Sequence, residues 1–214
     1  MNTPFEPTRV RALLFDLGGV LFDFDFAHAL DHWAPLSMLS REALGGAFVF
    51  DEAYQRHERG EISAEQYFDS LRQSLQLAAS DTQMAAGWNA IFRAEITPTL
   101  DAVQAARARF PCYAFTNTNA THHATWRAAY PQVEASFDRV FASSEIGLRK
   151  PERAAFTHVC AAIGKAPAEV LFFDDLLENA QGAIAVGMQA VQVRSPEDVR
   201  AALRQLGVDV PASR

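Results

Sequence analysis

Hydrophobic positions along the chain form short continuous runs, which are separated by longer stretches with helical spacing. The first apolar run covers residues 10–15 and ends at Asp16, directly before two glycines. A continuous apolar run that is closed by a turn signal is typical of a strand buried on both faces of a parallel sheet. Four later runs share this pattern and are expected to be strands: residues 112–115, 140–142, 170–173 and 190–193.

Helical patterns occupy the segments between these runs. We expect helices over residues 99–109, 151–163 and 178–186, and from Ser195 onward. Proline at the first helical position and glycine just after the last one are favoured, as at Pro151 and Gly164. Strands that alternate with helices predict an α/β fold, a doubly wound parallel sheet.

The stretch from residue 24 to residue 96 has a different pattern. It contains no convincing strand, and its helical spacing is interrupted by prolines and glycines, among them Gly60 and Gly87, so we expect four or five helices. An insertion of this size after the first strand predicts a helical cap domain, residues 23–96, on a core domain of residues 1–22 and 97–214. Ligands of open α/β sheets bind at the carboxyl ends of the strands, where this cap would lie.

Composition narrows the possible partners. The chain has 214 residues and a formal net charge of −7, which argues against binding to nucleic acid or to an anionic membrane. No secretory pattern occurs in the first eleven residues, and no apolar run approaches about 18 residues. We therefore expect a cytoplasmic protein without a membrane segment. Cys112 and Cys160 are expected to be buried, reduced thiols.

Polar side chains follow the predicted strands at their carboxyl ends. Each of these residues alone would be an ordinary turn or cap residue, but together they would meet at one edge of one sheet. They are Asp16, Thr116 with Asn117, Lys150 after the third strand, and Asp174 with Asp175.

These side chains are suited to phosphoryl transfer, which depends on positioning and charge neutralisation. Asp16 is a carboxylate that can act as a nucleophile. With Asp175 it supplies the hard oxygen ligands that Mg²⁺ prefers. Thr116 can donate its hydroxyl group to a phosphoryl oxygen, and Lys150 can neutralise the anionic phosphoryl group.

Four segments resemble, in order, the four motifs of the haloacid dehalogenase superfamily. They are residues 15–21, 115–117, 149–151 and 173–175. Two further segments, residues 57–63 and 116–119, resemble those of bacterial α-D-glucose-1-phosphate phosphatases. The resemblance implies a Rossmann-like core with a helical cap. It also implies a Mg²⁺-dependent phosphatase that acts through an aspartyl-phosphate on a small sugar phosphate, with α-D-glucose 1-phosphate as the expected substrate.

The resemblance also assigns roles to residues. Asp16 is the expected nucleophile and, with the Gly18 carbonyl group and Asp175, a metal ligand. Asp174 replaces a glycine of many members and is the weaker ligand candidate, and Asn179 is expected to hold a metal-bound water.

The remaining assignments concern the substrate. Thr116, Asn117 and Lys150 are expected to bind the phosphate. His57 and Arg59, in the cap, are expected to recognise substrate hydroxyl groups. His122 and His123 are expected mainly on a helix surface, and the tryptophans mainly in the core.

Gly18 departs from the superfamily's phosphatases, most of which have an acid two residues after the nucleophile. That acid protonates the leaving oxygen, and general acid–base catalysis contributes about 10²–10⁴-fold. Three interpretations stay open. Asp23 or Asp25 replaces the acid, the substrate has a good leaving group such as an anomeric hydroxyl, or turnover is slow and the protein mainly binds its ligand. A haloacid dehalogenase, which needs no metal, is the other alternative.

Overall fold

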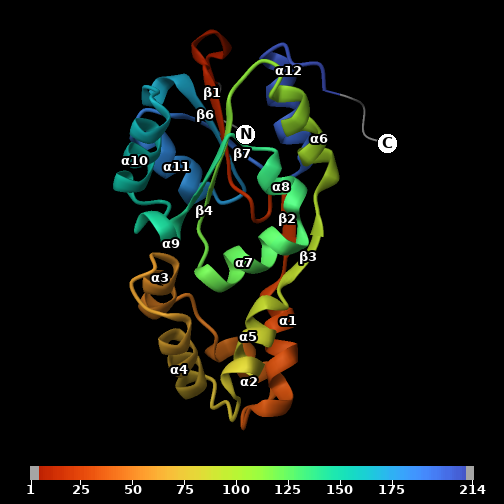
Figure 1. The fold of residues 1–214 in the computed structure, drawn as a ribbon, viewed down its shortest axis with the longest axis vertical. Helices are drawn as coiled ribbons and strands as arrows, with labels where there is room; N and C mark the ends of the chain where they lie inside the picture. Colours follow the sequence, from red (N-terminus) through yellow and green to blue (C-terminus); the bar gives the residue numbers. More distant parts are fainter. Residues whose placement is uncertain (1–4, 211–214) are drawn as a thin grey trace.

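A five-stranded parallel sheet forms the centre of the larger part of the molecule (Figure 1). The computed structural model of the protein describes residues 5–210; residues 1–4 and 211–214, the outer ends of the predicted core domain, lie outside them, as does the first part of the segment searched for a secretory pattern. The strand order is β5-β4-β1-β6-β7, with bounds β1 Ala12–Phe15, β4 Cys112–Thr116, β5 Arg139–Ala142, β6 Val170–Asp174 and β7 Gln189–Gln192. Each predicted strand is present, and the predicted doubly wound α/β fold is confirmed.

Helices cover both faces of the sheet. One face packs against α6 (Thr97–Ala106) and α12 (Pro196–Gln205), and the other against α10 (Arg153–Ile163) and α11 (Leu177–Ala185). Helix α10 begins two residues later than predicted, because Pro151 lies in the preceding turn. The remaining elements of the core are short: η1 Pro7–Arg9, α7 Ala120–Ala129, α8 Pro131–Ala135, α9 Ser143–Ile146 and η3 Pro167–Glu169.

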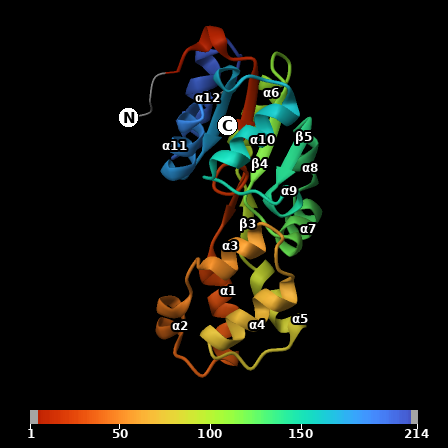
Figure 2. The same ribbon diagram turned by 90° about the vertical axis from the view of Figure 1, so that its left-hand side faces the viewer.

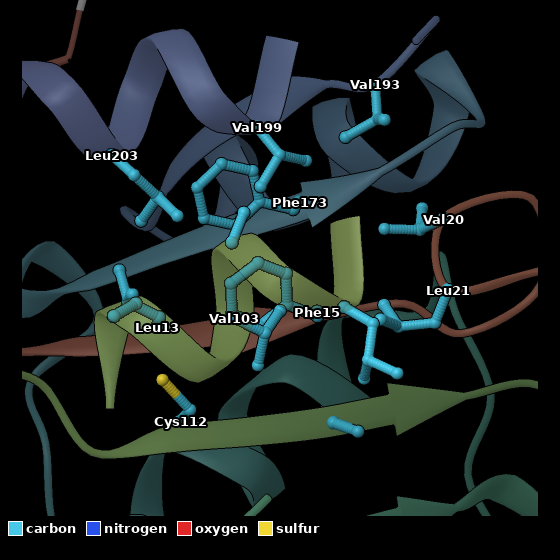
Figure 3. Packing of buried hydrophobic residues seen from close by; sticks show 14 of the residues in the cluster. Leu13, Phe15, Val20, Leu21, Val103, Cys112, Phe173, Val193, Val199 and Leu203 are labelled. Carbon is cyan, nitrogen blue, oxygen red and sulfur yellow. The ribbon is translucent and has the colours of Figure 1, made fainter. Parts of the chain in front are cut away.

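Strands β1 and β6 lie side by side, and their last aromatic residues pack against each other in the core. The rings of Phe15 and Phe173 stack with their centroids 4.6 Å apart, and they lie among Leu13, Val103 and Val199 (Figure 3). Phe15 of β1 pairs with Phe173 of β6 in the ladder. The residues that follow these two strands are therefore neighbours at one edge of the sheet.

The predicted cap is a cluster of helices at the carboxyl edge of the sheet (Figure 2). Within the described residues it contains five α-helices and one 3₁₀ turn: α1 Phe26–Trp33, η2 Ala34–Leu36, α2 Arg41–Ala47, α3 Glu52–Glu58, α4 Ala64–Ser74 and α5 Asp81–Asn89. Gly60 follows α3 with a φ of 69°, as a helix terminator does. Gly87, in contrast, lies inside α5, where a side chain would collide with the indole ring of Trp33.

An antiparallel pair of strands joins the cap to the core. Strand β2 (Phe22–Phe24) pairs with β3 (Phe92–Glu95), so the expectation of no strand between residues 24 and 96 is wrong. Strand β3 carries Arg93 and Glu95 and lacks an apolar run, and its partner lies about 70 residues earlier. The sequence around β3 therefore contains no local pattern that predicts this strand or its partner.

The interface of cap and core buries His122 on α7. Its ring stacks on that of Trp88 from α5 with centroids 4.4 Å apart, and its Nε2 lies 2.9 Å from the Trp88 carbonyl oxygen. Burial lowers the pKa of His122 to about 3, so the imidazole is neutral. His123 is also buried, and the expected surface position of both histidines is wrong.

Other expectations concern the core and the membrane. Trp33, Trp88 and Trp126 are buried, as are the free thiols of Cys112 and Cys160, as predicted. Among the helices of residues 5–210, none has the length and apolar character needed to cross a membrane.

Candidate active site

Lys150 is the centre of a buried group of charges at the carboxyl edge of the sheet. Its Nζ lies 2.8 Å from Asp16 Oδ1 and 2.7 Å from Asp174 Oδ2, and its side chain is fully buried. Burial disfavours the ammonium ion, but the two carboxylates outweigh burial and raise the pKa of Lys150. The ammonium group is thus a permanent positive charge beside Asp16.

Asp174 is held by several donors, which leaves it poorly available as a metal ligand. The Leu176 amide donates to Oδ1 at 2.9 Å, and the Asn179 side-chain amide donates to both oxygens, at 3.0 and 3.1 Å. Together with Lys150 these donors use most of the lone pairs of the carboxylate. Asp174 positions Lys150, in line with the weaker ligand role expected from the sequence.

Asn117 fixes the backbone of Lys150. Its side-chain oxygen accepts from the Lys150 amide, and its side-chain nitrogen donates to the Lys150 carbonyl oxygen, both at 2.9 Å. The amide predicted to bind phosphate is therefore engaged with Lys150. Thr116, at the end of β4, is buried and lies in the same cavity as Asp16.

The arrangement of the acids fits a hard divalent cation. Carboxylate oxygens of Asp16, Asp174 and Asp175 lie within 4.8 Å of one another. Burial and, to a smaller extent, the neighbouring Asp174 raise the pKa of Asp175 to about 6, although Lys150 opposes them. Asn179 Oδ1 is buried and has no hydrogen-bond partner, so a metal-bound water would satisfy it. Asp16 and Asp175, with the Gly18 carbonyl group, would thus hold Mg²⁺, and Asn179 would hold one of its waters, as the resemblance implies.

A cavity of about 310 Å³ opens in front of these acids. The cavity contains the core residues predicted for the site apart from Asp174, namely Asp16, Gly18, Thr116, Asn117, Lys150, Asp175 and Asn179. Its opposite wall is largely aromatic and comes from the cap and its stem: Phe24, Phe26, Phe50 and Tyr54. This volume is at the lower end of small-molecule sites, so the cavity suits a small phosphate ester.

The cap motif contributes Glu58 to this cavity, while the two neighbours predicted from the sequence lie elsewhere. His57 stacks on Tyr67 with ring centroids 4.7 Å apart, and Arg59 forms ion pairs with Glu61 and Glu152. Both lie outside the lining of the cavity that holds Asp16. Successive residues of a helix point about 100° apart, so at most one of the three would be expected to face the nucleophile.

Space beside Gly18 is filled by the ring of Phe24. A Cβ atom at position 18 would lie 2.8 Å from Phe24 Cε1, although the backbone of Gly18 is outside the left-handed region. The two acids proposed as replacements have other tasks: Asp25 caps α1 and Asp23 pairs with Arg93 at 3.2 Å. Neither lines the cavity.

Comparison with known proteins identifies the family. A model of haloacid dehalogenase-like hydrolases matches residues 10–187, so the chain belongs to this family of hydrolases. A sesquiterpene phosphatase of Aspergillus oryzae is 30% identical over 93% of this chain and 97% of its own length. A D-ribitol-5-phosphate phosphatase of Bacteroides thetaiotaomicron is 24% identical over 89% of this chain and 95% of its own length.

Solved structures agree with this assignment. A haloacid dehalogenase family enzyme from Bacteroides thetaiotaomicron, in complex with magnesium and inorganic phosphate, superposes with a TM-score of 0.74. It is 28% identical, and the match covers 85% of this chain and 92% of that one. A further relative, a drimenol cyclase of Aspergillus calidoustus, is 28% identical, but this chain spans only 36% of its length.

Proposed function

We propose that the protein is a Mg²⁺-dependent phosphatase that hydrolyses a small phosphate monoester through an aspartyl-phosphate on Asp16. The observation that carries this proposal is the fixed charge group at the sheet edge. There a nucleophilic carboxylate lies 2.8 Å from a buried ammonium ion and opens into a cavity shared with Asp175. The related enzyme that binds magnesium and inorganic phosphate supports the choice of metal and substrate class.

Each residue of the site has a separate role in the proposed reaction. Asp16 attacks phosphorus, while Lys150 and the Thr116 hydroxyl stabilise the charge on the phosphoryl oxygens. Bound Mg²⁺ would neutralise the charge repulsion between the carboxylate and the phosphate. Asp174 and Asn117 keep Lys150 in place, so the ammonium group needs no rearrangement as negative charge develops.

We propose α-D-glucose 1-phosphate as the first substrate to test. Aromatic side chains offer flat faces to a sugar ring, and the charged pair Glu58–Arg149 at the same cavity offers partners for hydroxyl groups. An anomeric hydroxyl is also a better leaving group than a simple alcohol, which suits a site without an acid at position 18. The likeness to a ribitol phosphate phosphatase agrees with a polyol substrate.

A second candidate substrate is a phosphate ester with an apolar alcohol. The aromatic wall continues to exposed side chains, with Phe50 56% and Leu176 49% exposed. Such a surface would bind a hydrocarbon chain, and the likeness to a sesquiterpene phosphatase agrees with this.

Phosphate release from both substrate classes, with Mg²⁺ and with a chelator, tests the proposal. We expect metal-dependent release that disappears in Asp16→Asn, a variant of nearly identical size. Glucose 6-phosphate should react more slowly than glucose 1-phosphate, and equal rates would contradict the leaving-group argument. Metal-independent halide release from 2-haloacids would favour a dehalogenase instead, and tight binding of sugar phosphate without turnover would favour a binding protein.

A further inference from the structure

The proposed phosphatase lacks a proton donor in the usual position. In the first half of the reaction the leaving oxygen needs a proton, and in the second half the attacking water must lose one. Gly18 has no side chain, and the Phe24 ring occupies the space that a side chain at this position would enter. The donor must therefore come from another part of the cavity.

Four carboxylates line the cavity within residues 5–210: Asp16, Glu58, Asp175 and Glu178. Asp16 is the nucleophile and Asp175 faces the metal position. Glu178 is exposed on the first turn of α11. Glu58 remains, a buried carboxyl group that the cap places opposite the sheet edge.

The surroundings of Glu58 hold its carboxyl group in one place. The Arg149 guanidinium donates to Glu58 Oε2 at 2.8 Å, and the Tyr54 hydroxyl, one helical turn earlier, also donates to this carboxyl group. The Ser143 hydroxyl donates to the Glu58 carbonyl oxygen at 2.6 Å and so ties the end of α3 to the core. The carboxyl group can thus face the substrate without being free to move.

We propose that Glu58 is the general acid and base of this phosphatase, a role that rests on the function proposed above. Asp16 forms the bond to phosphorus, the bond from phosphorus to the leaving oxygen breaks, and that oxygen takes the proton of Glu58. Water then attacks phosphorus and gives a proton back to Glu58. The electron pair of the broken bond returns to Asp16, and the alcohol and inorganic phosphate are the products.

The protonation state of Glu58 suits this cycle. Burial raises the pKa of Glu58, while the Arg149 guanidinium opposes that effect. The charged and titratable groups around it are Tyr54 on its own helix, Tyr67 on α4, and Arg149 and Lys150 on the facing core loop. A raised pKa brings the carboxyl group toward the range in which an acid and base can work near neutral pH.

Two phosphate esters of similar shape can show whether Glu58 donates a proton or only holds the cap in place. Phenyl phosphate needs a proton on its leaving oxygen more than 4-nitrophenyl phosphate does, because nitrophenolate is the weaker base. The ratio kcat/KM reports the steps up to departure of the leaving group. For Glu58→Gln we expect kcat/KM to fall about 10²-fold or more with phenyl phosphate, and less than about tenfold with 4-nitrophenyl phosphate.

A second readout follows from the missing base. Glu58→Gln should release nitrophenol from 4-nitrophenyl phosphate in a burst of about one equivalent, because the aspartyl-phosphate accumulates when water is not activated. Native protein should show no burst. The kcat/KM profile of native protein should fall as pH rises through the pKa of Glu58, because this step needs the protonated carboxyl group, and this basic limb should be absent in the variant.

Glu152→Gln is the matched control. It breaks a second ion pair between cap and core, Arg59–Glu152 at 3.1 Å, outside the cavity. We expect near-native kinetics with both esters. Equal losses for the two esters in Glu58→Gln, or no burst, would overturn the role of Glu58 while leaving the phosphatase intact. No phosphate release by native protein from either ester would overturn both proposals.

Discussion

The two walls of the cavity are held in different ways. At the sheet edge Lys150 forms ion pairs with Asp16 and Asp174, and these three residues are each at most 8% exposed. Apart from Glu58, the cap wall consists of rings that contact mainly each other, such as Phe50 and Tyr54 with centroids 4.8 Å apart, and Phe50 is 56% exposed. The sheet edge is therefore preorganised, whereas the aromatic part of the cap wall, which would meet the leaving group, can adapt.

Removing the positive charge of Lys150 should destabilise the group of charges at the sheet edge. Lys150→Gln leaves two buried carboxylates without their positive partner, which we expect to cost about 3–5 kcal/mol of unfolding free energy. The rate of phosphate release should also fall in this variant, because Lys150 no longer stabilises the charge on the phosphoryl oxygens. Urea denaturation measures the stability, and Lys165→Gln, a change at the chain's other lysine, should alter it by less than about 0.5 kcal/mol. A loss below about 1 kcal/mol for Lys150→Gln would contradict this picture.

Packing beneath the sheet edge should matter almost as much. Phe173→Ala removes a fully buried ring that stacks on Phe15 next to the nucleophile, and we expect a loss of about 3–5 kcal/mol. Activity should fall too, since the ladder of β1 and β6 places Asp16. Thermal and urea unfolding measure this effect. An unchanged stability would show that the core repacks around the cavity.

The contact between cap and core should weaken in acid. The folded-state pKa of His122, about 3, lies below the ordinary value near 6.5, so the unfolded chain binds this proton first. Stability from this residue is complete above pH 6.5 and is lost as pH falls, by about 1.4 kcal/mol per pH unit. Unfolding curves of native protein and His122→Gln should therefore converge between pH 7 and pH 5. Parallel pH dependences would contradict the buried neutral imidazole.

The smallest loss of stability is expected for a substitution in the aromatic part of the cap wall. Phe50→Ala is the same type of truncation as Phe173→Ala, but the ring is more than half exposed, and we expect less than about 0.5 kcal/mol of lost stability. Its effect should instead be a raised KM with little change in kcat, because the ring would contact the leaving group of a bound substrate and not its phosphoryl group. A large fall in kcat would show that the Phe50 ring, and not Glu58 alone among the cap residues, affects the chemical step.

The same contrast explains what the sequence could predict. Strands such as β1 and β6 are apolar runs buried on both faces, so their positions are encoded locally. Parallel topology then brings Asp16, Thr116, Lys150 and Asp175 to one edge without further information. This is why the core residues of the site were accessible from the sequence.

Contacts between distant segments were not accessible in this way. Glu58 and Arg149 are 91 residues apart, and only the orientation of α3 on the core decides that Glu58, rather than His57 or Arg59, enters the cavity. The position of Tyr54, four residues earlier, is the signal that could have selected it, because positions i and i+4 share a helix face. Strand β3 was missed for the same reason, since its partner precedes the whole cap.

The ring of Phe24 beside Gly18 constrains how this sequence can evolve. A carboxylate at position 18 would collide with that ring, since even its Cβ atom would lie 2.8 Å from Phe24 Cε1. A smaller residue at position 24, introduced first, would open a hole next to the nucleophile. The two positions are therefore expected to be epistatic, with either single substitution selected against and the pair tolerated. An acid in the catalytic loop of this protein would therefore require a matching change at the cap stem, where Phe24 lies.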